Sequence, residues 1–244
     1  MNLMKKEMNF FVHTKDVDQN DIIRPSAILD MFQDLAGLHA EELGVGYQHL
    51  KEKNYAWVVL YQRFEIKKLP PYLEQVNLIT WPKPKNRLEF EREYLLKDRN
   101  GFDLVQGISN WVIIDLHTRG LVRSDKIEFQ GEYETYTNYK EKCKRKLNLD
   151  STRIEQYFEY EVTLEDIDHN GHMNNARYLN SIQNVFFNID SKKYIRDVEI
   201  SYIKEARYKD KIRIGHYSSK DKDAFIGYVK DEVCFECLIG VEEL

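Results

Sequence analysis

The sequence of 244 residues predicts an α+β protein made of two tandem copies of one unit. Three observations carry this prediction: an acidic motif occurs twice, a second pattern follows it in the same order in both halves, and each half contains one helical segment followed by several long strands. In each copy we expect the long helix to pack against a bent antiparallel sheet. We expect the two sheets to merge side by side.

The acidic motif defines the repeat. Residues 16–20 read DVDQN and residues 166–170 read DIDHN, at an offset of 150. The second pattern relates residues 74–78, EQVNL, to residues 210–214, DKIRI, at an offset of 136. The shorter offset places a longer connection in the first copy.

The first predicted helix follows the first acidic motif. Pro25 suits the first turn of a helix, and apolar residues between positions 28 and 38 follow helical spacing. Gly44 or Gly46 is expected to end it.

The second predicted helix follows the second acidic motif. Asn174 or Asn175 can cap its N-terminus, because a side-chain oxygen at that position accepts a hydrogen bond from a free backbone N–H group. Its apolar spacing continues through Tyr178 and Phe186, and Asp190 marks the exit.

Strand patterns follow each helix and suit a meander of long antiparallel strands. In the first half they cover residues 57–66, 76–81, 88–97 and 103–116, with shorter counterparts between 195 and 242. A charged segment between the halves is predicted to be a linker outside the core. The predicted division is an N-terminal domain at 1–123, a linker at 124–155 and a C-terminal domain at 156–244.

Composition excludes several classes of protein. Apolar residues make up 42% of the chain, which is enough for a core. No run approaches transmembrane length and the N-terminal segment lacks a signal-peptide stretch, so we expect a cytoplasmic protein without a membrane span. Acidic and basic residues are mixed and the net charge is −5, unlike the basic surface of a nucleic-acid binder.

Cysteine usage predicts a reducing compartment and no metal site. The three cysteines give no even disulfide framework. Cys234 and Cys237 form a Cys-Phe-Glu-Cys pattern, but no second Cys or His pair lies nearby in the sequence. Positions three apart on a strand also point to opposite faces of the sheet.

The densest polar cluster is DIDHNGHMNNARY at residues 166–178, directly before the second helix. By composition alone, a polar loop with an elaborate N-cap explains it equally well. It is also suited to chemistry, because a helix N-terminus presents free N–H groups and a positive dipole end to an oxyanion. Asn170 and His172 can exchange hydrogen bonds there, and Asp168 can orient one of them.

This cluster resembles D-x-N-x-H-x-N-N-x-x-Y, the signature of the acyl-acyl carrier protein thioesterases, which have a double hotdog fold. In the first half, residues 43–47 (LGVGY), 57–58 (WV) and 80–82 (TWP) look like the N-terminal copy of that family. The resemblance covers essentially the whole chain. The fixed positions of the signature are Asp168, Asn170, His172, Asn174, Asn175 and Tyr178.

The family's further acidic residue lies in a motif resembling E-Y-x-x-E-C. Residues 201–206 read SYIKEA, so Glu205 matches the glutamate. On its own Glu205 is most simply a surface carboxylate beside Lys204. The resemblance implies instead a general base or a nucleophile. Ala206 stands where plant members have cysteine, which excludes a mechanism that needs a cysteine nucleophile.

The resemblance implies hydrolysis of fatty acyl-acyl carrier protein, which releases free fatty acid and ends chain elongation. A thiolate leaves readily because a free thiol has a pKa of about 8.5, so an activated water and an oxyanion site are the main needs. In our hypothesis Glu205 takes a proton from water, while Asn170 and His172 position that water and the carbonyl. Asp168 orients its neighbours. Direct attack by Glu205 to give an acyl anhydride stays open.

The helix start is expected to bind the substrate. Backbone N–H groups near Asn174 are expected to hold the oxyanion. Asn174 and Asn175 are both expected to bind the substrate. The chemistry uses only water, and no glycine-rich phosphate loop is present in the sequence, so no cofactor is implied.

An acyl carrier protein is the implied partner. Carriers in this family's pathway are acidic, so a basic patch should receive them. The sequence does not specify acyl length, saturation or oligomeric state, and a homodimer stays open. One candidate patch is Lys67, Lys68, Lys83, Lys85 and Arg87, and the other is Lys192, Lys193 and Arg196.

Two alternatives compete with this function. Single-hotdog acyl-CoA thioesterases share a looser form of the motif, so acyl-CoA is an alternative substrate, although the paired layout and Glu205 favour the carrier-linked one. A non-catalytic acyl-thioester binding protein is the other alternative, but it leaves Glu205 without a task.

The two copies differ at the positions that carry chemistry. His172 corresponds to Ile22, and Glu205 corresponds to Leu69. The first copy is therefore expected to keep the scaffold without the chemistry.

Two structural tasks are predicted for the first copy. Asp18 and Asn20 should only cap the loop before the first helix, so that Asn20→Ala costs stability and little turnover. Met31, Phe32 and Leu35 on the apolar face of that helix should line an acyl tunnel and select chain length.

Overall fold

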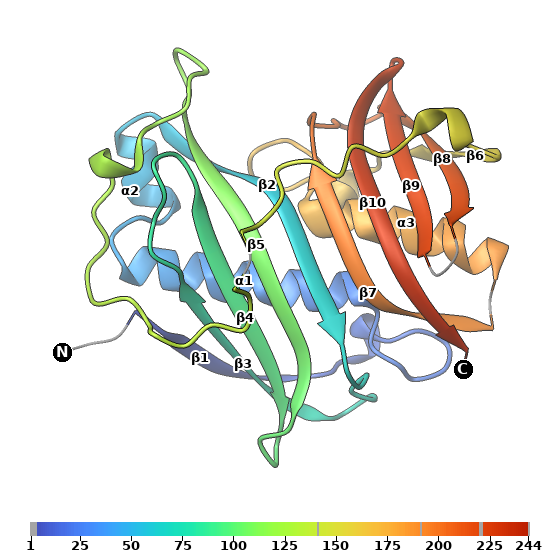
Figure 1. Cartoon of the computed structure of the whole chain (residues 1–244), viewed down its shortest axis with the longest axis horizontal. Coiled ribbons are helices and arrows are strands. Elements are labelled where there is room, and N and C mark those ends of the chain that lie inside the picture. The colour runs from blue at the N-terminus through green and yellow to red at the C-terminus, as the bar shows by residue number, and fades with distance from the viewer. Residues whose placement is uncertain (1–3, 141, 191, 220–221, 244) are drawn as a thin grey trace. The chain divides into compact units, whose positions relative to one another are not determined.

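The computed structural model describes residues 4–140, 142–190, 192–219 and 222–243 (Figure 1). Contacts divide the chain into unit 1, Met1–Lys144, and unit 2, Arg145–Leu244. None of the helices in the described ranges is long and apolar enough to span a membrane.

Unit 1 is an antiparallel sheet with one long helix across a face (Figure 1). The strand order is β1-β3-β4-β5-β2, and α2, a short helix that the sequence patterns did not predict, follows the long helix α1. The elements are β1 (Lys6–Phe11), α1 (Pro25–Glu42), α2 (Tyr47–Glu52), β2 (Tyr55–Ile66), β3 (Gln75–Pro82), β4 (Phe90–Asp98) and β5 (Asp103–Asp115).

Unit 2 repeats this arrangement, with α3 on one face of a sheet of order β6-β8-β9-β10-β7 (Figure 1). Each strand has its counterpart in unit 1 in the same place, β6 for β1, β8 for β3 and so on. The predicted repeat is therefore confirmed as two copies of one topology. The elements are β6 (Gln156–Glu161), α3 (Asn175–Ile189), β7 (Lys193–Tyr202), β8 (Lys211–Ser219), β9 (Lys222–Val229) and β10 (Glu232–Glu243).

The helix ends follow the predicted signals. α1 has Pro25 in its first turn, and Gly44, with φ of 72°, follows the last turn in a conformation that glycine adopts at no steric cost. α3 is capped by Asn174, whose Oδ1 accepts a hydrogen bond from the N–H of Ala176 at 2.9 Å. Asp190 ends α3 as predicted.

Side chains on β4 alternate between two buried faces of unit 1. Tyr94 stacks on Phe32 of α1 with ring centroids 4.3 Å apart, so even-numbered positions face the helix. Odd-numbered positions face the chain segment that follows β5: Glu91 accepts a hydrogen bond from the N–H of Cys143, and Glu93 accepts one from the N–H of Asn138. This alternation is what a strand buried on both faces requires.

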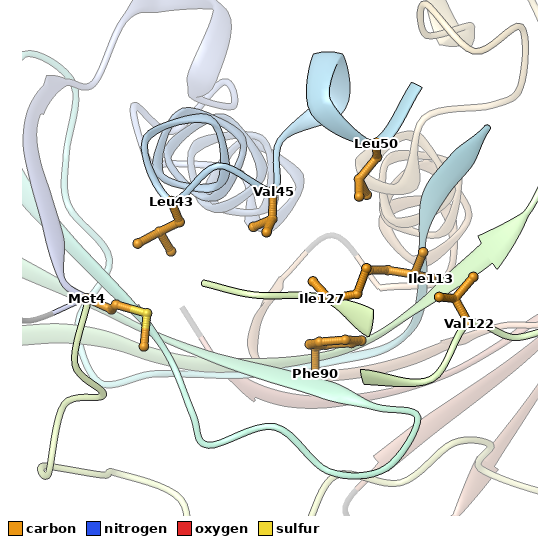
Figure 2. Close-up of a cluster of buried hydrophobic side chains, with 8 residues drawn as sticks. All are labelled: Met4, Leu43, Val45, Leu50, Phe90, Ile113, Val122 and Ile127. Atoms are coloured by element: carbon orange, nitrogen blue, oxygen red, sulfur yellow. The ribbon is translucent and has the colours of Figure 1, made fainter. Parts of the chain in front are cut away.

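The predicted linker does not lie wholly outside the core. Ile127 is buried in a cluster of apolar side chains in unit 1, which Figure 2 shows. In unit 2, Glu236 of β10 accepts hydrogen bonds from the N–H groups of Asn148 and Leu149. The two ends of the segment are thus bound to different units. The cluster consists of Met4, Leu43, Val45, Leu50, Phe90, Ile113, Val122 and Ile127.

Candidate functional site

The second acidic motif forms a tight loop directly before α3. Asp166 is buried and accepts hydrogen bonds from Tyr160 Oη and from the N–H of Thr163. The N–H of Asp168 donates to the carbonyl of His172 at 2.9 Å, and Gly171, with φ of 79°, closes the turn between them. The turn fixes which side chains of the motif reach the end of the helix.

Asp168 and Asn170 are bonded to each other. Asp168 Oδ1 accepts a hydrogen bond from the backbone N–H of Asn170 at 2.8 Å, and the Asn170 side-chain nitrogen lies 3.4 Å from Asp168 Oδ2. These contacts place Asp168 beside Asn170, and its role in orienting Asn170 stays a prediction. The Asn170 side chain is exposed on the loop, where a substrate could reach it.

His172 and Glu205 meet although 33 positions separate them in the sequence. Nε2 of His172 lies 3.0 Å from Oε2 of Glu205, and both side chains are partly exposed, at 27% and 37%. An ionised carboxylate only accepts hydrogen bonds, so Nε2 carries the proton in this pair. The four predicted catalytic residues thus form two pairs in hydrogen-bond contact, Asp168 with Asn170 and His172 with Glu205.

The loop that carries Glu205 is held on both sides of the residue. The carbonyl of Ala206 accepts a hydrogen bond from the N–H of Met173 at 2.8 Å. The N–H of Ala206 donates to Tyr178 Oη, also at 2.8 Å, in a buried position. Both contacts join the loop after β7 to the segment that begins α3.

Arg207 is a neighbour of the pair that the sequence patterns did not indicate. Its Nη2 lies 3.5 Å from Nε2 of His172, and its side chain is exposed. The motif contains no arginine at this position, and only its place two residues after Glu205 could have pointed to it.

Asn174 has a structural task that corrects part of the oxyanion prediction. Its backbone N–H donates to the carbonyl of Asp166 at 2.8 Å, and its side-chain oxygen caps α3. The Asn174 amide is therefore committed and cannot hold an oxyanion in this conformation. The neighbouring first-turn N–H group is that of Asn175, whose carbonyl accepts a hydrogen bond from Tyr202 Oη at 3.2 Å.

The counterpart loop in unit 1 has the same backbone and different chemistry. Asp18 accepts hydrogen bonds from the N–H groups of Asn20, at 2.8 Å, and Ile22, at 3.2 Å. The capping group is therefore the Asp18 carboxylate, whereas the Asn20 side chain is exposed on the loop. This corrects the predicted capping role of Asn20.

Met31 and Phe32 are both buried in unit 1. Phe32 lies between Tyr94 and Phe64, and a Cβ atom added at Gly107 would come within 2.4 Å of its ring. The glycine thus lets the ring lie directly against β5. The role of Met31 and Phe32 in acyl binding stays a prediction.

The first candidate patch for a carrier is wrong at two of its lysines. Lys83 is mostly buried and forms ion pairs with Glu91 at 3.1 Å and Glu93 at 3.7 Å. Lys85 donates to the carbonyls of Ser124 and Ile127. These ammonium groups hold the chain after β5 and are not available to a partner.

The second candidate patch lies on unit 2 with exposed ion pairs. Lys193 pairs with Asp190 at 3.0 Å and Arg196 with Glu242 at 3.1 Å. Exposed pairs of this kind contribute little stability, so an acidic partner can replace the acidic side chain at small cost.

Within the described ranges, no group of three or more His, Cys, Asp or Glu side chains is placed to hold a metal ion. Cys234 and Cys237 are buried on β10, and burial raises the pKa of Cys234 to about 12. A thiol that stays protonated near neutral pH is a poor metal ligand.

The two units share one topology, and in the second unit His172 and Glu205 are paired beside the N-terminus of its long helix. These features define a tandem hotdog protein with a candidate hydrolytic site in its second unit. The model of the acyl-ACP thioesterase N-terminal domain matches residues 4–130, and the model of the acyl-ACP thioesterase C-terminal domain matches residues 149–232. The chain belongs to the acyl-ACP thioesterase family.

Relatives of known name agree with this assignment. Over 211 residues the chain is 25% identical to the chloroplastic palmitoyl-acyl carrier protein thioesterase of Arabidopsis thaliana. The aligned region covers 81% of this chain and 51% of the relative. The chain is 24% identical over 187 residues to an oleoyl-acyl carrier protein thioesterase of the same plant, covering 70% and 51%. The chain thus spans about half the length of the curated relatives that it matches.

Solved structures show the same fold. An acyl-ACP thioesterase from Bacteroides thetaiotaomicron matches with a TM-score of 0.85 at 24% identity, covering 98% of both chains. The 12:0-ACP thioesterase from Umbellularia californica matches with a TM-score of 0.87 at 16% identity, covering 100% of this chain and 99% of the other. At these identities the likeness shows the fold alone.

Proposed function

We propose that this chain hydrolyses the thioester of fatty acyl-acyl carrier protein, releasing free fatty acid and ending chain elongation. The observation that carries the proposal is the 3.0 Å contact between His172 and Glu205 beside the start of α3. Membership of the acyl-ACP thioesterase family supports the choice of substrate.

In the proposed reaction Glu205 is the general base. His172 donates to Oε2 of Glu205, which leaves Oε1 to accept a proton from a water molecule. The water oxygen adds to the thioester carbonyl, and the first-turn N–H of Asn175 stabilises the resulting oxyanion. The carbon–sulfur bond then breaks, and the thiolate leaves with the proton that Glu205 had accepted.

Asn170 and Asp168 have the positioning roles in this scheme. Asp168 holds Asn170 through two contacts, so the Asn170 amide is presented on the loop with few alternative orientations. That amide is placed to hydrogen-bond the attacking water or the carbonyl.

A covalent route through Glu205 is the alternative mechanism. In that route the carboxylate attacks the carbonyl, an acyl anhydride forms as the thiolate leaves, and water then releases the acid. A single turnover in water enriched in oxygen-18 tests this route. Label in Glu205 supports the anhydride, because direct attack by water on the thioester places the label only in the fatty acid.

The carrier is proposed to bind at Lys192, Lys193 and Arg196, because Lys83 and Lys85 of the other patch are committed to the chain after β5. Replacing Lys193 or Arg196 by Ala should raise KM for the carrier substrate and weaken its salt dependence. An unchanged salt response would reject this patch. A cytoplasmic location and a homodimer stay predictions from the sequence.

The defining experiment offers the chain a mixture of acyl-carrier proteins and identifies the released fatty acids. Release of acid by the native chain and not by Glu205→Gln supports the proposal, and no release from any carrier would reject hydrolysis. Relative kcat/KM on matched acyl-carrier and acyl-CoA substrates decides between the two carriers. Tight binding of an acyl thioester without turnover would favour the non-catalytic alternative.

A further inference from the structure

The hydrogen bond between Tyr178 and Ala206 joins α3 to the loop that carries Glu205. Tyr178 is buried, and its Oη accepts the N–H of Ala206 at 2.8 Å. Ala206 directly follows Glu205, so this bond fixes the peptide at the base of the Glu205 side chain. The carbonyl of Ala206 accepts the N–H of Met173, which follows His172. The backbone that follows His172 and the helix residue Tyr178 are therefore both hydrogen-bonded to Ala206, the residue after Glu205.

The Tyr178 ring does not need the hydroxyl for its packing. The ring makes edge contacts with Tyr202 and Phe235, with centroids 5.7 Å and 5.6 Å away. A phenylalanine ring in the same place would keep both contacts. Burial raises the pKa of Tyr178, so the group remains a neutral phenol. Its distinctive contribution is the hydrogen bond to Ala206.

Unit 1 provides an internal comparison for this bond. At the two repeat offsets, Tyr178 corresponds to Ile28, which has no hydroxyl, and Ala206 corresponds to Pro70, which has no N–H. Both halves of the hydrogen bond are absent from the copy that also lacks the histidine and the glutamate. The helix and strands of that copy form without it.

The other backbone contact of Ala206, made by its carbonyl, has a counterpart in unit 1. The N–H of Ile23 donates to the carbonyl of Pro70 at 3.4 Å, as that of Met173 donates to Ala206 at 2.8 Å. The contact that serves the fold is thus present twice. The Tyr178 contact is present only where the loop carries Glu205.

We propose that Tyr178 is a positioning residue, whose hydroxyl holds the Ala206 amide and thereby keeps the Glu205 carboxylate against His172. The inference rests on the proposed function of Glu205 as the base. A misplacement of about 1 Å at a reacting group costs on the order of a hundredfold in rate. Loss of the hydroxyl should therefore act on turnover and not on substrate affinity.

The test is a double-mutant cycle on hydrolysis of an acyl-carrier substrate by the full chain. Tyr178→Phe should lower kcat by about ten- to a hundredfold with KM within about twofold. In a Glu205→Gln background the same change should have no further effect, because its target is already gone. Tyr139→Phe is the control, since it removes a half-buried tyrosine hydroxyl that donates to the carbonyl of Gln106 in unit 1, and it should leave kcat unchanged.

A second variant and a structural readout keep the outcome clear if Tyr178→Phe is unstable. Ala206→Pro removes the N–H as unit 1 does at Pro70, and it should lower kcat non-additively with Tyr178→Phe. A crystal structure of Tyr178→Phe should show the His172 Nε2 to Glu205 Oε2 distance longer than 3.0 Å.

Three results would each overturn the inference. They are native kcat in both variants, an equal loss from Tyr178→Phe with and without Glu205, and an unchanged distance between His172 and Glu205 in the variant crystal structure. A native chain that releases no fatty acid would instead reject the proposed function, and the distance would still test the anchoring role of Tyr178.

Discussion

Nη1 of Arg92 lies 3.0 Å from Nδ1 of His39 in the interior of unit 1, where both side chains are buried. A guanidinium group only donates hydrogen bonds, so Nδ1 accepts and His39 is neutral. Burial, followed by the charge of Arg92, lowers the pKa of His39 to about 3.

This pair predicts a loss of stability in mild acid. The ordinary pKa of histidine is about 6.5, so below that pH the unfolded chain takes up a proton that folded His39 does not. The stability from neutral His39 is complete above pH 6.5 and is lost as pH falls toward 3. We expect the free energy of unfolding to fall by about 1 kcal/mol per pH unit between pH 6 and pH 5.

The prediction is checked by measuring the free energy of unfolding in urea for the native chain and for His39→Asn between pH 6 and pH 5. Asn offers Arg92 an amide oxygen in place of Nδ1 and does not titrate, so its slope should be smaller. Equal slopes in the two proteins would show that His39 is not the titrating group.

Asp18 and Asp168 each accept a hydrogen bond from the backbone N–H two residues further on, and their predicted roles differ. Asp18→Ala should lower the free energy of unfolding by about 1 kcal/mol, a typical loss for a capping carboxylate, and leave kcat within about twofold. Asp168→Ala should cost similar stability and lower kcat by more than tenfold because it also releases Asn170. Asn20→Ala and Asn170→Ala give the parallel comparison. Large, equal losses of kcat in both copies would show two working sites.

Glu93 holds the chain after β5 on the sheet of unit 1. It is fully buried and accepts hydrogen bonds from Thr137 and from the N–H groups of Asn138 and Tyr139. Glu93→Ala should cost about 3 kcal/mol, because it leaves these donors and Lys83 without the carboxylate. Proteolysis near residues 134–144 should become faster than in the native chain. The exposed Glu128→Ala serves as the control, and equal cleavage rates in the two variants would contradict this role.

Phe32 tests chain selection by unit 1. Phe32→Leu opens space between α1 and Gly107, where the ring now lies. We expect released fatty acids to shift in length while turnover of the best substrate stays within about tenfold. Met31→Ala should act in the same way, whereas Leu38→Ala, on an exposed position of the same helix, should not. An unchanged product profile for both buried variants would place the acyl chain elsewhere.

The repeated topology was predictable because local signals coincide with the fold. Pro25 and Asn174 mark helix starts through their own backbone chemistry, and the period-two patterns mark the strands. The burial of Ile127 was less predictable because this residue lies in a segment that is mostly charged and polar. Burial of Glu91 and Glu93 depends on N–H groups some fifty positions away, which no local pattern indicates.

The candidate site was predictable in its members and less so in its contacts. The motif contains Asp168, Asn170 and His172 within five positions, whereas the pairing of His172 with Glu205 depends on how the loop after β7 returns to α3. The same return brings Arg207 to the pair and commits the Asn174 amide to Asp166. These are consequences of tertiary geometry and could not be read from spacing.

The most direct test of the account is the turnover of Glu205→Gln on an acyl-carrier substrate, measured beside the exposed control Glu165→Gln of the same unit. Glutamine keeps the shape of the side chain and cannot take a proton from water. We predict a kcat about two to four orders of magnitude below that of the native chain, with the thermal midpoint retained, and similar losses for His172→Ala and Asn170→Ala. Near-native turnover in Glu205→Gln would contradict the account and remove Glu205 from the chemistry.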